Sequence, residues 1–424
     1  MQANIRAHNH ALESNHQAQL GFLQQQLERQ GIEAESVIET LRTFQVAIPT
    51  WALGAGGTRF GRFSMGGEPS NLREKIEDIG LIHALTQSAG AISLHIPWDI
   101  PEDTEATKAL ANSYDLVFDA VNSNTFQDQA DQALSYKFGS LCHTDPSVRT
   151  QAIDHNKTVI DIGKSLGSNS LTVWLSDGAS FPGQLNFQQS LQRTVESLQE
   201  IYAYMPEDWK MYIEYKPYEP NFYSTVIQDW GTSHLLASDC GERAYCLVDL
   251  GHHLPNTNIE QIVATLMWRG KLGGFHFNDS KYGDDDLTVG SIKPYQLFLI
   301  FNELVYGMED PASSNPALAW MIDASHNVKD PLEDLMQSLE AIRLAYAHAL
   351  IVNREALQQA RDQNDVSIGQ ELLQDAYRTD VRPLLREARR RDGGAIQPIA
   401  AYRAWEIRKK LIDKRGSEAV ATGL

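Results

Sequence analysis

The sequence alternates short apolar runs with longer amphipathic stretches, and this alternation limits the fold more than any other feature. Apolar runs of this length are typical of buried strands, and the stretches between them have the spacing of surface helices. Eight such units in succession predict an α/β protein with a (β/α)8, or TIM, barrel. A doubly wound sheet is the alternative, but such sheets rarely reach eight regular units, and there is no convincing GxGxxG. The expected strands are residues 45–51, 91–98, 116–124, 171–177, 209–217, 245–253, 271–279 and 317–327.

The proposed barrel leaves a helical segment at each end of the chain. We expect residues 1–44 to form an N-terminal helical lead-in, 45–349 the catalytic barrel, and 350–424 a C-terminal helical extension that serves oligomerisation. The basic stretch 378–415 includes REARRR and EIRKK. We interpret it as a solvated or subunit-contacting helix, with an RNA-binding arm as the alternative.

Composition excludes several classes of function. A formal net charge of −19 disfavours nucleic acid as a partner, because phosphate binding depends on Lys and Arg. No apolar run approaches the roughly 20 residues of a membrane span, and the polar N-terminus has no signal-peptide core, so we expect a soluble, cytoplasmic protein. Cys142, Cys240 and Cys246 lack CxxC spacing, and we expect buried thiols rather than disulfides or a thiolate zinc site.

Polar side chains gather at the C-terminal ends of the expected strands, which meet at one mouth of a barrel. Crowded carboxylates in a partly dry pocket require divalent cations to balance their charge. The run GDDD (283–286) could instead be a solvated acidic loop. The collected residues are His95, Asp177, Glu214, Lys216, Asp249, His252, His276, Asp279 and Asp323.

Spacing divides the candidate ligands into two sets. His252 lies three residues after Asp249, so the loop can turn its imidazole back toward the mouth. Asp284 and Asp286 point the same way in an extended loop, whereas Asp285 points elsewhere. Oxygen-rich sets with one imidazole suit Mn²⁺, Mg²⁺ or Co²⁺ better than thiol-seeking metals. The first set is Glu214, Asp249, His276 and Asp323, and the second is His252, Asp284 and Asp286.

Other residues near the mouth have two readings each. Lys216 points inward beside Glu214, where it is either a charge partner or a cation that neutralises a developing oxyanion. Trp51, Trp98 and Trp174 are either core residues or rings on which the C–H faces of a sugar stack.

Three further features have structural readings. GAGGTRFGR (54–62) fits neither a dinucleotide fingerprint nor a P-loop, and we expect a flexible loop over the barrel mouth. His253 and His326 are expected to cap loops or satisfy backbone groups rather than bind metal.

From about residue 40 to 410, the chain resembles the bacterial L-rhamnose isomerase family of the broad-specificity kind, and its layout is also similar to xylose isomerase. The motifs that carry the resemblance are long and specific. They are TWALGAGGTRFGRF, SLHIPWD, AVNSNTF, SYKFGSL, LTVWLSDG, YEPNFYSTVIQDWGT, VDLGHHLPNTNIE, GGFHFNDSKYGDDDL and MIDASHN.

The resemblance implies a metal-dependent aldose–ketose isomerase that interconverts L-rhamnose and L-rhamnulose, and also rare sugars such as D-allulose and D-allose. It implies a homotetramer with two divalent ions per subunit, Mn²⁺ first, with Co²⁺, Mg²⁺ or Zn²⁺ as alternatives. The first set above matches the structural-metal ligands and the second the catalytic-metal ligands.

The resemblance also assigns substrate contacts. Lys216 and His95 match substrate-contacting positions, and Asp323 is a candidate for hydroxyl proton transfer during a hydride shift; a cis-enediol route is the rival. One departure is Tyr215, where the family commonly has histidine. The resemblance therefore indicates the reaction type more firmly than the preferred sugar. The aromatic wall matches Trp51, Phe126 and Trp174, and Phe60 matches a residue lent to a neighbouring subunit.

Three other functions are compatible with a barrel of this kind. A single-metal ketose 3-epimerase would place two opposed glutamates on its substrate, whereas only Glu214 stands at a strand end. A zinc phosphodiesterase acting on DNA would need a basic mouth. A catalytically silent sugar-binding protein would not require Lys216 beside a complete ligand set.

Overall fold

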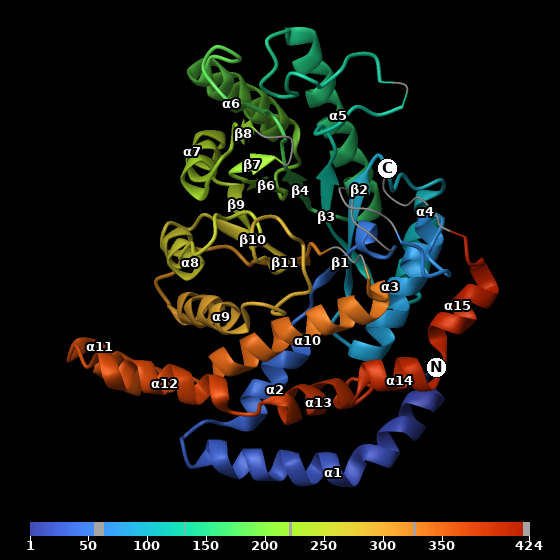
Figure 1. Cartoon of the computed structure of the whole chain (residues 1–424), viewed down its shortest axis with the longest axis vertical. Helices are drawn as coiled ribbons and strands as arrows, with labels where there is room; N and C mark the ends of the chain where they lie inside the picture. Colours follow the sequence, from blue (N-terminus) through green and yellow to red (C-terminus); the bar gives the residue numbers. More distant parts are fainter. Residues whose placement is uncertain (55–62, 131, 220–222, 325–327, 419–424) are drawn as a thin grey trace.

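The computed structural model describes residues 1–54, 63–130, 132–219, 223–324 and 328–418. Within them, eight parallel strands close into a barrel in the order β1-β11-β10-β9-β6-β4-β3-β2, surrounded by helices (Figure 1). The predicted (β/α)8 fold is therefore confirmed. Each barrel strand falls within one of the expected segments or starts one residue before it. The barrel strands are β1 (Ala47–Pro49), β2 (Ala91–Ile96), β3 (Val117–Ser123), β4 (Ser170–Val173), β6 (Lys210–Glu214), β9 (Ala244–Asp249), β10 (Leu272–Phe277) and β11 (Ala319–Ile322).

The helices that follow the strands begin at residues suited to capping. Asn71, Asp103, Asn186 and Asp229, for example, each accept a hydrogen bond from a backbone N–H in the first turn of the next helix. These caps fix where each strand-to-helix loop ends. The helices around the barrel are α3 (Leu72–Thr86), α4 (Thr104–Asn112), α5 (Pro146–Leu166), α6 (Phe187–Tyr204), α7 (Trp230–Cys240), α8 (Ile259–Trp268), α9 (Pro294–Glu309) and α10 (Pro331–Leu350), and η1 (Thr50–Ala52) follows β1.

Strand β10 illustrates how local sequence fixes the direction of a polar side chain. All six residues of LGGFHF are buried. A Cβ on Gly274 would stand 2.3 Å from the carbonyl oxygen of Ala319, so only glycine permits this close pairing with β11. Phe275 and Phe277 stack on the ring of Trp320 outside the barrel, and the alternation of the strand therefore directs His276 inward.

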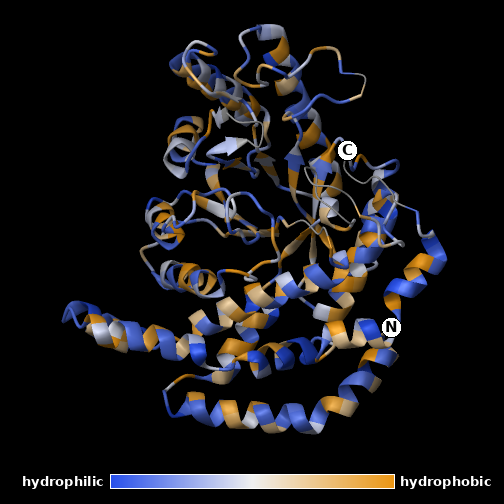
Figure 2. Ribbon diagram, in the orientation of Figure 1, coloured by the Kyte–Doolittle hydropathy of each residue, from blue (hydrophilic) through white to orange (hydrophobic). Residues whose placement is uncertain are grey.

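Helices from both ends of the chain pack beneath the barrel (Figure 1). The lead-in forms α1 (Gln2–Glu28), whose hydrophobic residues are interspersed with hydrophilic ones in Figure 2, and α2 (Ala34–Thr43). Helix α13 (Arg382–Arg391) contacts both of them. The remaining C-terminal helices are α11 (Arg354–Asp362), α12 (Val366–Arg378), α14 (Pro398–Ala404) and α15 (Ile407–Arg415).

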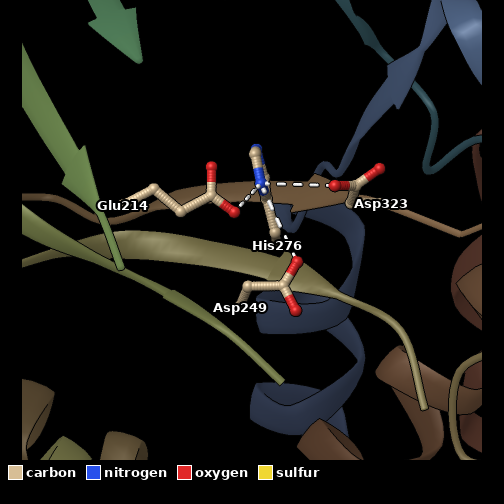
Figure 3. A group of neighbouring side chains, drawn as sticks. All are labelled: Glu214, Asp249, His276 and Asp323. Atoms are coloured by element: carbon tan, nitrogen blue, oxygen red, sulfur yellow. Dashed lines mark hydrogen bonds and ion pairs between the residues drawn. The ribbon is translucent and has the colours of Figure 1, made fainter. Parts of the chain in front are cut away.

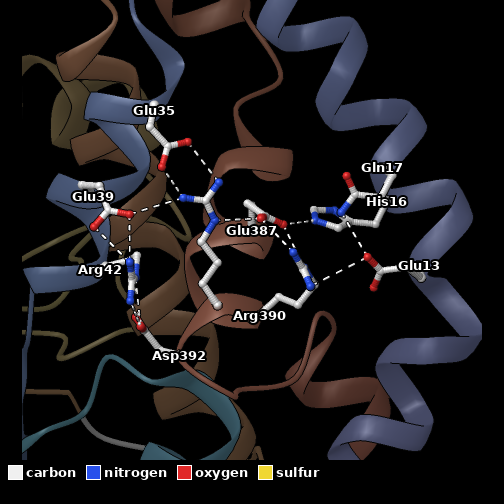
Figure 4. A network of polar contacts seen from close by, with 10 residues as sticks. Glu13, His16, Gln17, Glu35, Glu39, Arg42, Glu387, Arg390 and Asp392 are labelled. Carbon is white, nitrogen blue, oxygen red and sulfur yellow. Dashed lines mark hydrogen bonds and ion pairs between the residues drawn. The ribbon is translucent and has the colours of Figure 1, made fainter.

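The basic run REARRR packs against the lead-in helices rather than lying free in solvent, so the solvated interpretation is wrong. Its contact with another subunit stays a prediction. In Figure 4, Glu387 lies at the centre of an internal network between α13 and the lead-in helices. Its carboxylate accepts hydrogen bonds from Arg390 and Arg391 at 2.8 to 2.9 Å, and lies 2.9 Å from Nε2 of His16. Arg391 also pairs with Glu35. These arginines serve to fasten the two ends of the chain together.

A small antiparallel sheet, β5-β8-β7, was not predicted. Its strands are β5 (Gly178–Ala179), β7 (Tyr218–Glu219) and β8 (Tyr223–Thr225). Strands this short carry no periodicity that could be read from sequence.

Three other expectations have different outcomes. Most of GAGGTRFGR lies outside the described residues. The three cysteines are free and buried, as expected. No helix among the described residues is long and apolar enough to cross a membrane.

Candidate functional site

Four side chains from neighbouring strands meet at the C-terminal end of the barrel. Glu214 ends β6, Asp249 ends β9, His276 is on β10 and Asp323 follows β11. Each offers one ligand atom, and these atoms all lie within 4.8 Å of one another. Figure 3 shows the three carboxylates around Nδ1 of His276, at 3.1 Å for Glu214, 4.0 Å for Asp249 and 3.7 Å for Asp323. We call this group the four-residue cluster.

A second group adjoins the first and shares Asp249 with it. Asp249, His252 and Asp284 also offer ligand atoms within 4.8 Å of one another. Nε2 of His252 lies 3.4 Å from Oδ1 of Asp284. Asp286 lines the same cavity without belonging to either group. Its backbone is left-handed, with φ 48°, so the loop is not extended as the sequence argument assumed.

The neighbouring aspartates of this loop face different surroundings, as expected. Asp284 and Asp286 both line the cavity. Asp285 instead accepts hydrogen bonds from the backbone N–H groups of Lys281 and Tyr282, at 2.5 and 2.8 Å. Its carboxylate organises the loop.

The charges at this end of the barrel do not balance. Burial, together with the nearby Glu214 and Asp323 carboxylates and against the effect of His252, raises the pKa of Asp249 to about 7. Burial opposes protonation of His276 and His252, but the surrounding carboxylates raise the pKa of each imidazole to about 9. Carboxylates buried this close together attract protons onto the neighbouring imidazoles, and the same negative potential favours a bound cation.

Lys216 provides a fixed positive charge at the edge of the acidic region. Its ammonium lies 2.8 Å from Oδ2 of Asp284 and 5.1 Å from the centre of the Trp174 ring. The side chain is buried and lines the cavity, which agrees with the expected inward direction beside Glu214. Tyr215 points away, as expected, and its hydroxyl lies 2.7 Å from Nε2 of His253.

Aromatic rings form the opposite wall of the cavity, on the side of β1 to β4. The rings of Trp51 and Trp98 lie 5.3 and 4.3 Å from that of His95. The ring of Phe126 lies 5.5 Å from His95 and 4.6 Å from Trp174. Burial lowers the pKa of His95 to about 3, so its imidazole is neutral. The three tryptophans therefore belong to the cavity rather than to the core.

The cavity has a volume of about 240 Å³, and acidic groups line one half of it while aromatic groups line the other. Sequence reasoning missed several polar residues of its lining. Their neutral side chains carry no charge pattern, and only their places on β3 and β4, or just after β3, could have indicated them. They are Asn122, Ser123, Gln127 and Thr172.

Three predicted mouth residues do not line the cavity. Asp249 is buried beneath it and belongs to both ligand groups, whereas Asp177 and Asp279 belong to neither. Asp177 accepts hydrogen bonds from the backbone of Ser140 and Cys142, at 2.7 and 2.9 Å. Asp279 accepts them from the backbone of Ile292 and Lys293, at 2.7 and 2.9 Å. A carboxylate just beyond a strand end serves a loop backbone as readily as an ion, and the sequence does not distinguish the two uses.

The remaining predicted residues are His253, His326 and Phe60. His253 contacts Leu250 O and the Tyr215 hydroxyl and does not line the cavity, as expected for a structural residue. His326 and Phe60 lie outside the described residues.

The residues of the four-residue cluster fit a divalent cation. Three carboxylates and one imidazole converge from four strands in a buried place, and oxygen with imidazole donors suit Mn²⁺ or Mg²⁺. Asn278 donates hydrogen bonds to both oxygens of Asp249, at 2.9 and 3.1 Å, as second partners of metal ligands commonly do.

Comparisons with known proteins agree with this fold. Residues 84–307 match the family model described as "Xylose isomerase-like TIM barrel". A probable sugar isomerase of Mesorhizobium japonicum is 52% identical over 401 residues, covering 95% of this chain and 93% of the relative. The xylose isomerase of Thermus thermophilus is 26% identical over 240 residues, covering 52% of this chain and 60% of that enzyme.

Among solved structures, a D-allulose 3-epimerase from a Methylomonas species, in complex with D-allulose, superposes with a TM-score of 0.53 at 14% identity. It covers 72% of this chain and 97% of that one, and this likeness concerns the fold. From the family match and the identity to its full-length relative, the chain belongs to the xylose isomerase-like TIM barrel family.

Proposed function

We propose that this protein is a metal-dependent sugar isomerase that interconverts an aldose and its ketose, with L-rhamnose and L-rhamnulose as the first pair to test. One observation carries the proposal: a buried cluster of three carboxylates and a histidine faces a wall of aromatic rings across one cavity. The names of the relatives, a probable sugar isomerase and a xylose isomerase, support it. Rare sugars such as D-allose and D-allulose are further candidates.

We assign one divalent ion to the four-residue cluster and a second to His252, Asp284 and Asp286, with Mn²⁺ ahead of Co²⁺, Mg²⁺ or Zn²⁺. When bound, such ions act as Lewis acids that polarise the sugar carbonyl and its neighbouring hydroxyl. The protein's contribution is to fix these ligands on rigid strand ends, so that little reorganisation is needed during the reaction.

Lys216 is placed to stabilise the negative charge that develops on a sugar oxygen. Its ammonium is buried, lines the cavity and is held beside Asp284. A cation already fixed in a dry site stabilises a developing oxyanion more than a solvated one does. Asp323, at the border between the cluster and Trp51, is the candidate that takes and returns the hydroxyl proton.

The aromatic wall orients the rest of the sugar. Trp51, Trp98, Phe126 and Trp174 offer apolar faces on which C–H groups stack, while neutral His95 can donate to or accept from a hydroxyl. With the acidic half of the cavity holding the reacting end, the open chain would extend from the cluster toward this wall.

The test is an assay of aldoses and ketoses after chelation and after return of Mn²⁺, Co²⁺ or Mg²⁺. We expect chelation to abolish conversion of L-rhamnose to L-rhamnulose and Mn²⁺ to restore it. Exclusive 3-epimerisation of a ketose, or turnover unaffected by chelation, would contradict the proposal. In D₂O, a hydride shift leaves C1 of the product without deuterium, whereas an enediol route incorporates it.

We further propose a cytoplasmic homotetramer, in which Phe60 contributes to a neighbouring active site. This part of the proposal rests on the sequence resemblance alone, and sedimentation together with Phe60→Ala kinetics would test it.

A further inference from the structure

A buried ion pair lies directly behind the aromatic wall. Nζ of Lys75, on α3, is 2.6 Å from Oδ1 of Asp99, in the turn after β2. The side chains are 4% and 1% exposed. Burying two charges costs a large desolvation free energy, so a buried ion pair is weak evidence of stabilisation. The other contacts of Asp99 indicate a different role.

The second oxygen of Asp99 connects two segments that are far apart in the sequence, η1 and the end of β2. Oδ2 accepts a hydrogen bond of 2.6 Å from the hydroxyl of Thr50, in η1, and one of 3.0 Å from the backbone N–H of His95. The backbone N–H of Asp99 donates in turn to His95 O at 3.0 Å. One carboxylate therefore fixes η1 against the turn that ends β2.

These two segments carry the aromatic wall. Trp51 follows Thr50, while His95 and Trp98 lie in the segment that ends at Asp99, and all three rings line the cavity. The rings of Trp51 and His95 are nearly perpendicular, and the Nε1–H of Trp51 donates to Oδ1 of Asp323 at 2.8 Å. A shift of η1 would therefore move both a cavity ring and a contact of the four-residue cluster.

We propose that Asp99 is a positioning residue, which sets the aromatic wall through Thr50 and His95 and transmits that setting to Asp323 through Trp51. Asp99 does not itself line the cavity. An aspartate is needed because three donors converge on its two oxygens. An asparagine would present an N–H₂ group to one of those donors and leave Lys75 buried without a counter-charge. The kinetic consequence rests on the proposed isomerase function, but the consequence for metal binding does not.

The test compares Asp99→Asn and Thr50→Val with the wild type in two measurements. Thr50→Val removes one hydroxyl and keeps the shape, so it serves if Asp99→Asn fails to fold. We expect KM for the sugar to rise about tenfold in Asp99→Asn and about threefold in Thr50→Val, with kcat changed less, because a misplaced wall weakens substrate orientation. The Mn²⁺ affinity of the tighter site, measured by calorimetry, should also fall more in Asp99→Asn than in Thr50→Val.

The matched control is Asp78→Asn. Asp78 is also on α3 and makes a buried ion pair, at 2.8 Å with Arg415, and within the described ranges it forms no hydrogen bond or ion pair with a residue that lines the cavity. We expect it to lower thermal stability while leaving KM and Mn²⁺ affinity unchanged. Folded Thr50→Val protein with wild-type KM and Mn²⁺ affinity would overturn the proposal. If the wild type itself turned over no sugar, the proposed function would be overturned. The comparison of Mn²⁺ affinities would then decide the role of Asp99.

Discussion

The indole Nε1–H of Trp51 donates a hydrogen bond of 2.8 Å to Oδ1 of Asp323, and so joins the aromatic wall to the four-residue cluster. Trp51→Phe would keep a ring in the wall but remove this donor. We expect about a tenfold loss of Mn²⁺ affinity, because partners that orient a metal ligand contribute this much. Isothermal calorimetry measures it. The control is Trp98→Phe, since Nε1 of Trp98 has no partner among the described residues, and its Mn²⁺ affinity should match the wild type.

Asp286 and the adjacent Asp285 should differ in their effect on activity, because only Asp286 is a proposed ligand of the second metal ion. Asp286→Asn should reduce turnover by about a hundredfold or more, since it would weaken one of the two proposed Lewis acids, while circular dichroism stays unchanged. Asp285→Asn is the control, because the side-chain oxygen of asparagine can still accept from Lys281 and Tyr282. Equal rates for both variants and the wild type would remove Asp286 from the site.

Glu387 should make the stability of the contacts between α13 and the lead-in helices depend on pH. Burial opposes its ionisation, but hydrogen bonds from Arg390, His16 and Arg391 lower its pKa to about 2. A carboxyl whose pKa is lower in the folded state stabilises the fold above its unfolded pKa near 4.5, and this contribution is lost as pH falls toward 2. The difference in thermal midpoint between wild type and Glu387→Gln should therefore be constant above pH 5 and shrink below it. A difference independent of pH would contradict this role.

Helix α15 packs against the segment that leads into α3, and Gly67 makes the close approach. Gly67 has φ 75°, and a Cβ there would stand 2.7 Å from the backbone nitrogen of Ile412. Gly31 has the same φ with nothing within 4 Å. Both Gly→Ala changes carry the left-handed backbone cost of about 1 to 2 kcal/mol. Chemical denaturation should show a larger loss of unfolding free energy for Gly67→Ala than for Gly31→Ala. Equal losses would mean that α15 shifts to accommodate the added methyl group at little cost.

The sequence predicted the strands and the four side chains that meet at their C-terminal ends, because both depend on local patterns. Buried parallel strands are continuous apolar runs, and their C-terminal ends converge whatever the loops do. The direction of Asp177 and Asp279 depends on which loop backbone lies nearby, and that is decided by tertiary packing. The same holds for Arg391, whose partner Glu35 is more than 350 residues away in the chain. Neutral residues such as Asn122 and Thr172 give no signal at all until the strands are paired.

Divalent cations are proposed to bind where these strands end, and anomalous diffraction from crystals soaked in Mn²⁺ would locate them. We predict one strong peak bound by Glu214, Asp249, His276 and Asp323, and a second bound by His252, Asp284 and Asp286. Absence of anomalous density at both positions, in crystals soaked at millimolar Mn²⁺, would show that these residues do not form a metal site.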